Sequence, residues 1–197
     1  MTSSRLPGKP LFQANNISML AHLVLRLKSL KIIDEIILAT TTNNEDQPLV
    51  DEAIKLGIKV FRGDEHNVMK RVIDAAESVN ADVIVEITGD CPIIDPAIIQ
   101  ESIEIFNQNK YDYVGNALVR SYPDGMDTQV FLLDTLKKSY SMTNSIIDYE
   151  HVTLHIRNNP EIFTHYNMKA PNELFWPELG LTLDEDKDYI LLNNIIV

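Results

Sequence analysis

The feature that most constrains this chain is a regular alternation of strand-like and helix-like segments. Short apolar, β-branched runs of strand length occupy residues 35–39, 58–61, 82–88 and 111–114. Between them, apolar side chains recur every three or four residues, as in 68–79, which is the spacing of one helix face. Strands that alternate with helices predict an α/β fold with a mostly parallel sheet and helices on both of its faces.

Other segments complete this prediction. Further helices are expected at residues 17–27, 49–56, 95–106, 134–142 and 148–158, and from 184 to the end; further strands are expected at 128–132 and 179–183. Asp95 followed by Pro96 is a typical helix start. Residues 121–168 are less regular, and we expect them to form a flap or lobe over the sheet. The 197 residues therefore predict a single domain, 1–197, rather than two.

The acidic composition narrows the range of partners. The chain carries 29 acidic and 17 basic side chains, for a net charge of -12. Such a surface repels a phosphate backbone, which argues against a nucleic-acid partner, although an anionic small molecule can bind where basic groups converge. Cys91 is the only cysteine, so an intramolecular disulfide is impossible. Because the sequence lacks both a membrane-length apolar run and the apolar core of a signal peptide, we expect a cytoplasmic protein with no membrane partner.

The first candidate for chemistry is the basic segment SSRLPGKP, residues 3–10. Glycine lets a backbone approach a phosphate closely, and successive N–H groups can form an anion-binding nest. Arg5 can bind phosphate through two parallel hydrogen bonds, and Lys9 supplies a point charge. The segment suits a triphosphate, but a basic N-terminal tail explains these residues equally well.

Two aspartates follow apolar strands. Asp90 comes shortly after the strand at 82–88, and Asp184 follows the one at 179–183. Ligands of such folds bind beyond the carboxyl ends of the strands, so we expect both carboxylates at that edge. Mg²⁺ prefers oxygen ligands of this kind. A helix cap is the alternative role for Asp184, and spacing alone slightly favours it.

The remaining polar candidates have ordinary explanations. Arg71 fits a solvated helix face, and Glu150 and His151 fit structural positions. Cys91 fits a packed side chain better than a nucleophile, because no histidine lies near it in the sequence. The sequence shows no convincing Ser/His/Asp set and no zinc-ligand spacing.

Seven motifs occur in order along the chain: RLPGKPL, ATT, FRGDEHNVMKR, ITGDCPIIDP, YPDGMDTQVF, EHVTLHIRNNPE and LTLDEDKDY. Together they resemble the cytidylyltransferase family, which includes the acylneuraminate and 3-deoxy-manno-octulosonate cytidylyltransferases. The likeness is greatest to the spore coat polysaccharide biosynthesis protein F group. It extends over about residues 2–189, nearly the whole chain.

This resemblance implies a Rossmann-like fold of the nucleotide-diphospho-sugar transferase type, with a small dimerisation lobe and a homodimeric assembly. It implies attack of a sugar oxygen on the α-phosphate of a nucleoside triphosphate, usually CTP, with release of pyrophosphate and with Mg²⁺ as cofactor. The acceptor would be a sugar acid or a sugar phosphate used in surface polysaccharide or glycan biosynthesis.

The resemblance also implies residue roles. Ser4, Arg5, Gly8 and Lys9 match the triphosphate-binding loop, Arg71 matches an arginine near the nucleotide, and Asp90 and Asp184 match the Mg²⁺ ligands. Arg5, Lys9 and Asp90 would be the catalytic residues. The sugar-binding candidates are Asp124, Gly125 and Asp127, with Glu150 and His151 contributed by the lobe to the sugar site or to dimer contacts.

The chain departs from the family pattern at its start, because the family normally has a strand before the basic loop. We therefore expect this central strand to be missing from the chain. Two other functions stay open. One is a glycosyltransferase that consumes a nucleotide sugar, since Asp184-Glu185-Asp186 superficially has the form of the DxD metal motif. The other is an inactive, truncated homologue that acts as a binding module.

Overall fold

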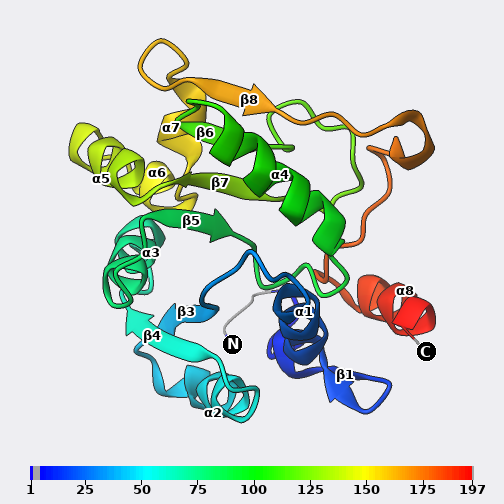
Figure 1. The fold of residues 1–197 in the computed structure, drawn as a ribbon. Helices are drawn as coiled ribbons and strands as arrows, with labels where there is room; N and C mark the ends of the chain where they lie inside the picture. Colours follow the sequence, from blue (N-terminus) through cyan, green and yellow to red (C-terminus); the bar gives the residue numbers. More distant parts are fainter. Residues whose placement is uncertain (2–4, 197) are drawn as a thin grey trace.

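The computed structural model describes Met1 and residues 5–196, and its strands form three hydrogen-bonded groups (Figure 1). A small hairpin pairs β1 (Gln13–Ala14) with β2 (Ile17–Ser18). A parallel pair joins β3 (Ile37–Thr41) and β4 (Lys59–Gly63). The third group has the order β5-β7-β6-β8 and consists of β5 (Val83–Glu86), β7 (Gln129–Leu132), β6 (Tyr113–Gly115) and β8 (His165–Asn167).

Helices separate most of these strands, so the predicted α/β class is confirmed. The α-helices are α1 (Met19–Lys28), α2 (Gln47–Lys55), α3 (Val68–Glu77), α4 (Pro96–Gln108), α5 (Leu133–Met142), α6 (Ile146–Glu150), α7 (Leu154–Asn158) and α8 (Asp186–Ile196). Short 3-10 helices are η1 (Lys9–Leu11), η2 (Asn44–Asp46) and η3 (Asn172–Leu174). Within the described residues, none of the helices is long and apolar enough to cross a membrane.

The strands are less uniformly parallel than the sequence predicted. β3 pairs with β4, and β6 with β8, in parallel, but β7 runs antiparallel to both β5 and β6. The reason lies in the connection from β6 to β7. A parallel neighbour needs a crossover that returns the chain to the starting edge. Here a loop turns the chain around instead, so that Gly115, where β6 ends, pairs with Gln129, where β7 begins.

The sheet is also divided between β3 and β5. In the part of the chain that the structure describes, no strand pairs with either of them on the sides where they face each other. Leu38 and Ala39 of β3 are only partly buried, although the sequence predicted a buried strand there.

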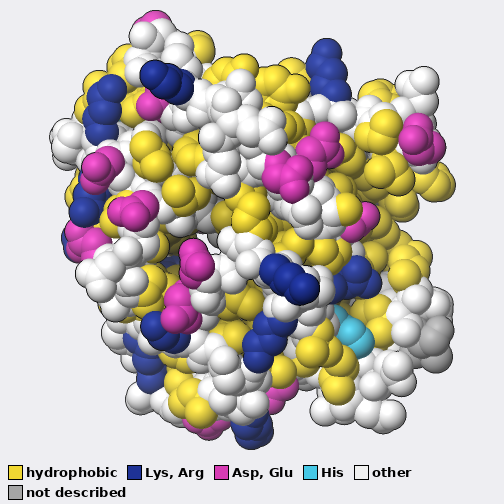
Figure 2. All heavy atoms as spheres, in the orientation of Figure 1, with side chains coloured by type: hydrophobic (Ala, Val, Ile, Leu, Met, Phe, Trp, Pro, Cys, Tyr) yellow, Lys and Arg dark blue, Asp and Glu magenta, His cyan; other side chains and the backbone are white. Residues whose placement is uncertain are grey.

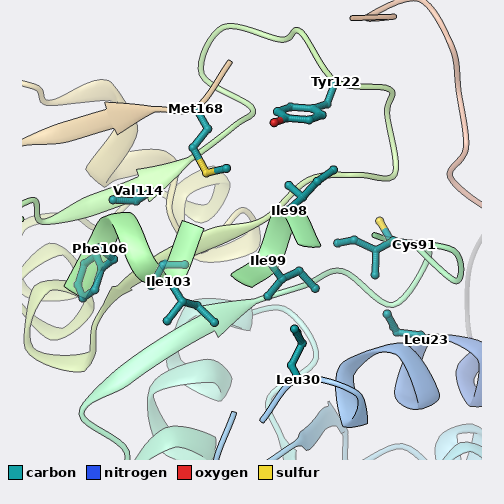
Figure 3. Packing of buried hydrophobic residues seen from close by; sticks show 12 residues of the cluster. Leu23, Leu30, Cys91, Ile98, Ile99, Ile103, Phe106, Val114, Tyr122 and Met168 are labelled. Atoms are coloured by element: carbon teal, nitrogen blue, oxygen red, sulfur yellow. The ribbon is translucent and has the colours of Figure 1, made fainter. Parts of the chain in front are cut away.

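Helix α4 anchors one face of the four-stranded sheet. Asp95 caps it by accepting a hydrogen bond from the Ala97 N–H at 2.8 Å, as predicted from the Asp-Pro sequence. Figure 3 shows the helix's apolar side chains directed toward Val114 and Met168 on one side and toward the α1 region on the other. These side chains are Ile98, Ile99, Ile103 and Phe106.

A second apolar cluster covers the opposite face. Met69 and Ile73 of α3, Leu136 of α5 and Ile156 of α7 pack with Tyr113 and Phe131 of the sheet. Helices therefore cover both faces of the sheet, as the alternating sequence pattern predicted. The space-filling view shows acidic and basic side chains interspersed with apolar ones over the displayed face (Figure 2), so the net negative charge is not gathered there into one patch.

Two predicted elements are wrong in detail. The helix expected at 148–158 is two short helices, because Val152 adopts a left-handed φ of 44° between them and Thr153 donates a 2.5 Å hydrogen bond to Gln129. The strand expected at 179–183 is a single parallel bridge between Gly180 and Asp124. The hydrogen bond between Thr153 and Gln129 explains the first error. The second arises because only one residue of the 179–183 segment, Gly180, bridges to the 121–128 loop.

Gly125 is needed for that contact. Its φ is 96°, and a Cβ added to it would lie 2.7 Å from the Leu181 carbonyl carbon. We expect Gly125→Ala to lower the free energy of unfolding by about 2 kcal/mol, since it adds both backbone strain and a clash with main-chain atoms. Urea denaturation measures this. Gly180→Ala is the matched control, because a Cβ added to Gly180 would meet no atom within 4 Å. Equal urea midpoints for the two variants would contradict the argument.

Candidate active site

A small apolar cluster brings three distant segments together at the carboxyl edge of β5. Leu6 of the basic loop, Ile93 after β5, and Leu181 and Leu183 before α8 pack in one group. The Leu183 N–H also donates a 2.8 Å hydrogen bond to the carbonyl oxygen of Asp90. This packing places the side chains of the three segments beside one another.

Lys9 stands at the centre of the arrangement. Its ammonium donates to Asp184 Oδ1 at 2.9 Å and to Asp90 Oδ2 at 3.3 Å. The Arg5 guanidinium lies 3.0 Å from the same Asp184 oxygen. The structure thus joins four of the predicted residues into one cluster of two carboxylates and two cations, as expected for strands whose carboxyl ends share an edge.

The charges in this cluster support one another. Burial alone would raise the pKa of Asp184, but the hydrogen bond from Lys9 and the charges of Lys9 and Arg5 outweigh it and hold that pKa below its usual value.

The side chain of Asp184 is therefore engaged with cations, not with the start of α8. Instead, Asp188 accepts hydrogen bonds from the Asp184 and Glu185 N–H groups, at 3.1 and 2.8 Å. The helix-cap alternative for Asp184 is wrong.

The basic loop has the backbone form that a glycine permits. Gly8 adopts a φ of 74°, and its N–H donates to the Met1 carbonyl at 3.1 Å. Pro10 lies in the first turn of η1, where its fixed φ suits a helix. The nucleotide-binding prediction for Ser4 falls outside the described residues.

Cys91 follows Asp90, and its surroundings do not suit a nucleophile. It is 1% exposed, and burial raises the pKa of its thiol well above the usual value, reinforced by the negative charge of Asp90. The residue packs in the apolar cluster around α4, and its sulfur lies 3.2 Å from Thr88 Oγ1 and 3.6 Å from Asp90 Oδ1. The sequence interpretation of Cys91 as a packed side chain is confirmed.

Arg71 lies apart from the Lys9 cluster, on α3 just beyond the carboxyl end of β4. Its Nη1 donates to the backbone carbonyls of Asp64 and Glu65. Burial lowers the pKa of the guanidinium, and the nearby carboxylates oppose that shift. The Arg71 side chain is therefore fixed by hydrogen bonds at the carboxyl edge of the strands. It is not the solvated helix-face residue that the pattern alone suggested.

The sugar-pocket candidates are organised by a residue that the sequence did not single out. Arg120 binds Asp127 through both carboxylate oxygens, at 3.1 and 2.9 Å, and also lies 3.1 Å from Asp124. Burial raises the pKa of Asp127, and Arg120 opposes that rise. The spacing of Arg120 from these acids, four and seven residues, was the signal that could have revealed the pairing.

A second group of polar side chains was also missed. Gln129 accepts hydrogen bonds from Tyr113 Oη at 2.9 Å and Thr153 Oγ1 at 2.5 Å, and donates to Glu86 Oε2 at 3.3 Å. We call these four residues the polar row. Gly115 makes room for it, because a Cβ there would lie 2.5 Å from Tyr113 Oη. A glutamate inside the apolar run DVIVEIT was the signal in the sequence.

Glu150 and His151 do not join either group. Both are exposed, at the end of α6. No hydrogen bond or ion pair among the described residues joins them to Lys9, Asp90 or Asp184, and their role in sugar binding or dimer contacts stays a prediction.

The carboxylate pair fits the predicted magnesium ion. Among the described residues, no group of three or more His, Cys, Asp or Glu side chains could hold a metal. Mg²⁺ differs from metals that need such a set, because it is usually held by one or two carboxylates together with substrate phosphates and water. Asp90 and Asp184 already converge on a single cation, the Lys9 ammonium, so their positions suit this mode of binding.

The comparisons with known proteins agree with this geometry. The fold and the edge cluster define an α/β nucleotidyltransferase: a solved cytidylyltransferase from Leptospira borgpetersenii superposes with a TM-score of 0.92 at 33% identity, over 98% of this chain and 81% of that one. The cytidylyltransferase family model matches residues 1–190. The chain belongs to the cytidylyltransferase family.

Two relatives match nearly the full chain. An uncharacterised protein of Methanocaldococcus jannaschii is 35% identical over 189 residues, which cover 96% of this chain and 76% of the relative. The spore coat polysaccharide biosynthesis protein SpsF of Bacillus subtilis is 32% identical over 199 residues, 96% of this chain and 80% of its own. The resemblance identified from the seven motifs is confirmed.

The raised pKa of Glu86 in the polar row predicts that stability depends on pH. Burial raises the pKa of Glu86 to about 7, and Arg157 opposes the shift. Because the folded-state pKa lies above the unfolded value, the folded state favours the neutral acid, and stability falls as pH rises from about 4.5 to 7. We expect Glu86→Gln to remove this loss. The free energy of unfolding of the variant minus that of the parent should therefore be higher at pH 8 than at pH 4, by on the order of 2 kcal/mol.

Urea denaturation at the two pH values measures the difference. Glu161→Gln, at an exposed position, is the control. Parallel pH profiles for the parent chain and Glu86→Gln would show that Glu86 is not shielded in the folded protein.

Proposed function

We propose that this chain transfers CMP from CTP to an acidic sugar, a sugar acid or a sugar phosphate, and releases pyrophosphate. The observation that carries the proposal is the convergence of Lys9 and Arg5 on Asp90 and Asp184 at the carboxyl edge of β5. Family membership supports a nucleotidyl transfer, and the spore coat relative supports a role in surface polysaccharide biosynthesis.

In this reaction, a sugar oxygen forms a bond to the α-phosphorus as the bond to the bridging oxygen breaks. Pyrophosphate leaves with the electron pair, and the sugar hydroxyl gives up its proton to solvent. Such transfers need positioning and neutralisation of charge more than covalent chemistry by the protein. Lys9 and Arg5 are the cations that would hold the β- and γ-phosphates and stabilise the departing pyrophosphate.

The two aspartates would hold Mg²⁺ against the phosphate oxygens. Bound there, the ion supplies charge neutralisation for the phosphate group under attack. Asp90 and Asp184 supply the oxygen ligands. Lys9, which neutralises both carboxylates in the free protein, would turn its ammonium toward the triphosphate. We expect EDTA to abolish turnover for this reason.

The position of Asp186 supports this proposal over a glycosyltransferase. Asp184 bonds to Lys9 and Arg5, whereas Asp186 is exposed at the start of α8. A DxD motif would require both aspartates at the metal. The geometry supports a site built from Asp90 and Asp184 instead, with Asp186 outside it.

Asp90→Asn and Asp184→Asn are expected to lower the rate of pyrophosphate release by about 10²-fold or more, because each removes charge stabilisation from the transition state. The assay offers each of the four nucleoside triphosphates with a panel of acidic sugars and sugar phosphates. Asp186→Asn is the matched control and should keep the parent rate.

Three outcomes are informative. Release that needs CTP and one sugar, and is lost in Asp90→Asn, supports the proposal. In a parallel assay that offers a nucleotide sugar, its consumption by the parent chain without pyrophosphate release, together with an equal loss of that activity in Asp184→Asn and Asp186→Asn, would favour a glycosyltransferase. Binding of CTP with no turnover on any sugar would favour a binding module.

The proposal includes a homodimer formed through the lobe. Ile146, Ile147 and Met142 are 75%, 59% and 46% exposed in one short stretch of α5 and α6. Neighbouring apolar side chains on a surface are typical of a protein interface. We expect an Ile146→Asp, Ile147→Asp double variant to run as a monomer in light scattering, and an Ile54→Asp control on α2 to keep the parent mass. A monomeric parent chain would contradict this assembly.

A further inference from the structure

We propose that Arg157 is the cation that recognises the acid group of the acceptor sugar. The inference rests on the proposed function and adds a specificity-determining residue to it. It begins with the state of the guanidinium itself: Nε is buried and has no hydrogen-bond partner in the described structure. A buried donor without a partner is costly, and its persistence suggests that a ligand supplies the acceptor.

Arg157 differs in its partners from Arg71, the other half-buried arginine with this feature. Arg71 also has an unpaired Nε, but its Nη1 atom donates to two backbone carbonyls. In the described residues, the side chain of Arg157 makes no hydrogen bond or ion pair. Five N–H donors in a planar fork are therefore available, and that fork matches the two oxygens of a carboxylate or phosphate.

The acids near Arg157 are already engaged. Arg157 lies close enough to Glu86 and Asp127 to act on both through its charge. Both oxygens of Asp127 are bonded to Arg120, and Glu86 accepts from Gln129. Since neither acid bonds to Arg157 directly, the guanidinium keeps its capacity for an anion from outside.

The helix that carries Arg157 is held firmly against the sheet. Thr153, one residue before α7, donates to Gln129 at 2.5 Å, and the Arg157 N–H bonds to the Thr153 carbonyl at 2.9 Å. Val152, buried and with a φ of 44°, lies between α6 and α7, where the chain turns so that α7 reaches this position. Strain of this kind in a β-branched residue is kept only where the surrounding structure demands it. Arg157 is thus pre-organised.

The location suits an acceptor that must meet the nucleotide. Asp127 lies within electrostatic range of both Arg157 and Cys91, and the Cys91 sulfur is 3.6 Å from Asp90 Oδ1. Asp127 is therefore near both Arg157 and Cys91, the residue that follows Asp90 in the sequence. A sugar bound by its acid group at Arg157 could present a hydroxyl toward the phosphate held near Asp90.

The alternative is that Arg157 only balances the charge of Glu86 and Asp127. The two roles differ in what a substitution changes. A structural cation affects folding stability and both substrates together. An acceptor anchor affects the KM of the acidic sugar and leaves the KM of CTP alone.

The experiment measures KM and kcat of the parent chain, Arg157→Gln and Arg157→Lys for CTP and for two acidic acceptors, 3-deoxy-manno-octulosonate and N-acetylneuraminate. We expect Arg157→Gln to raise the acceptor KM by about tenfold or more, as for loss of a charged hydrogen-bonded pair, with the CTP KM unchanged. Arg157→Lys should recover part of the loss. Lys137→Gln, a surface cation on α5 paired with Glu77, is the control.

The proposal is overturned if Arg157→Gln lowers the thermal midpoint while both KM values stay at the parent level, or if the KM of CTP rises equally. Thermal shifts by the same two acids provide a readout that does not depend on turnover. Absence of pyrophosphate release from every pair would count against the proposed function alone. In that case, a thermal shift that occurs in the parent chain and is lost in Arg157→Gln would still support the anion site. An equal thermal shift in both proteins, or no shift in either, would refute it.

Discussion

The ammonium of Lys9, shared between Asp90 and Asp184, is the interaction on which the active edge depends. Two carboxylates brought together at one sheet edge repel each other unless a cation lies between them. Lys9 supplies that cation in the free protein, and Arg5 adds a second contact to Asp184. The same positive charges suit a triphosphate, so the arrangement that stabilises the free site also prepares it for an anionic substrate.

Apolar packing positions the three segments that carry the charged residues of the site. Leu6, Ile93 and Leu183 come from three distant parts of the chain and form one cluster under the charged groups. The loop geometry then depends on few backbone positions, chiefly Gly8 and Gly125, whose positive φ values other residues adopt only with strain. Packing fixes where the loops meet, and the glycines permit the turns that aim their side chains.

The two groups of polar residues suggest a division of labour. The cluster of Lys9, Asp90 and Asp184 faces the nucleotide in the proposed reaction, while no hydrogen bond or ion pair among the described residues joins the polar row or Arg157 to that cluster. Arg120 holds Asp127, which lies within electrostatic range of Arg157, by a two-point ion pair. If the acceptor binds as proposed, exchange of the residues around Arg157 would change the sugar without disturbing the nucleotide.

Much of the architecture could be predicted from local patterns. The apolar runs at β3, β4 and β5 and the Asp95 cap of α4 follow from periodicity and capping chemistry, which act within a few residues. The errors have a common cause. The direction of β7, the break at Val152 and the reduced contact at Gly180 depend on loops and distant partners, which local spacing does not contain.

The sequence by itself determined the α/β class and the family and predicted the residues of the candidate site, because alternating hydrophobicity and ordered motifs carry that information. Only the tertiary structure decided which of these residues meet. It rejected the cap for Asp184, joined Arg120 to Asp127 and left the Arg157 guanidinium without a hydrogen bond among the described residues. Hydrogen bonds and ion pairs form across space between segments whose separation along the chain says nothing about their distance, so these pairings could be seen only in the fold.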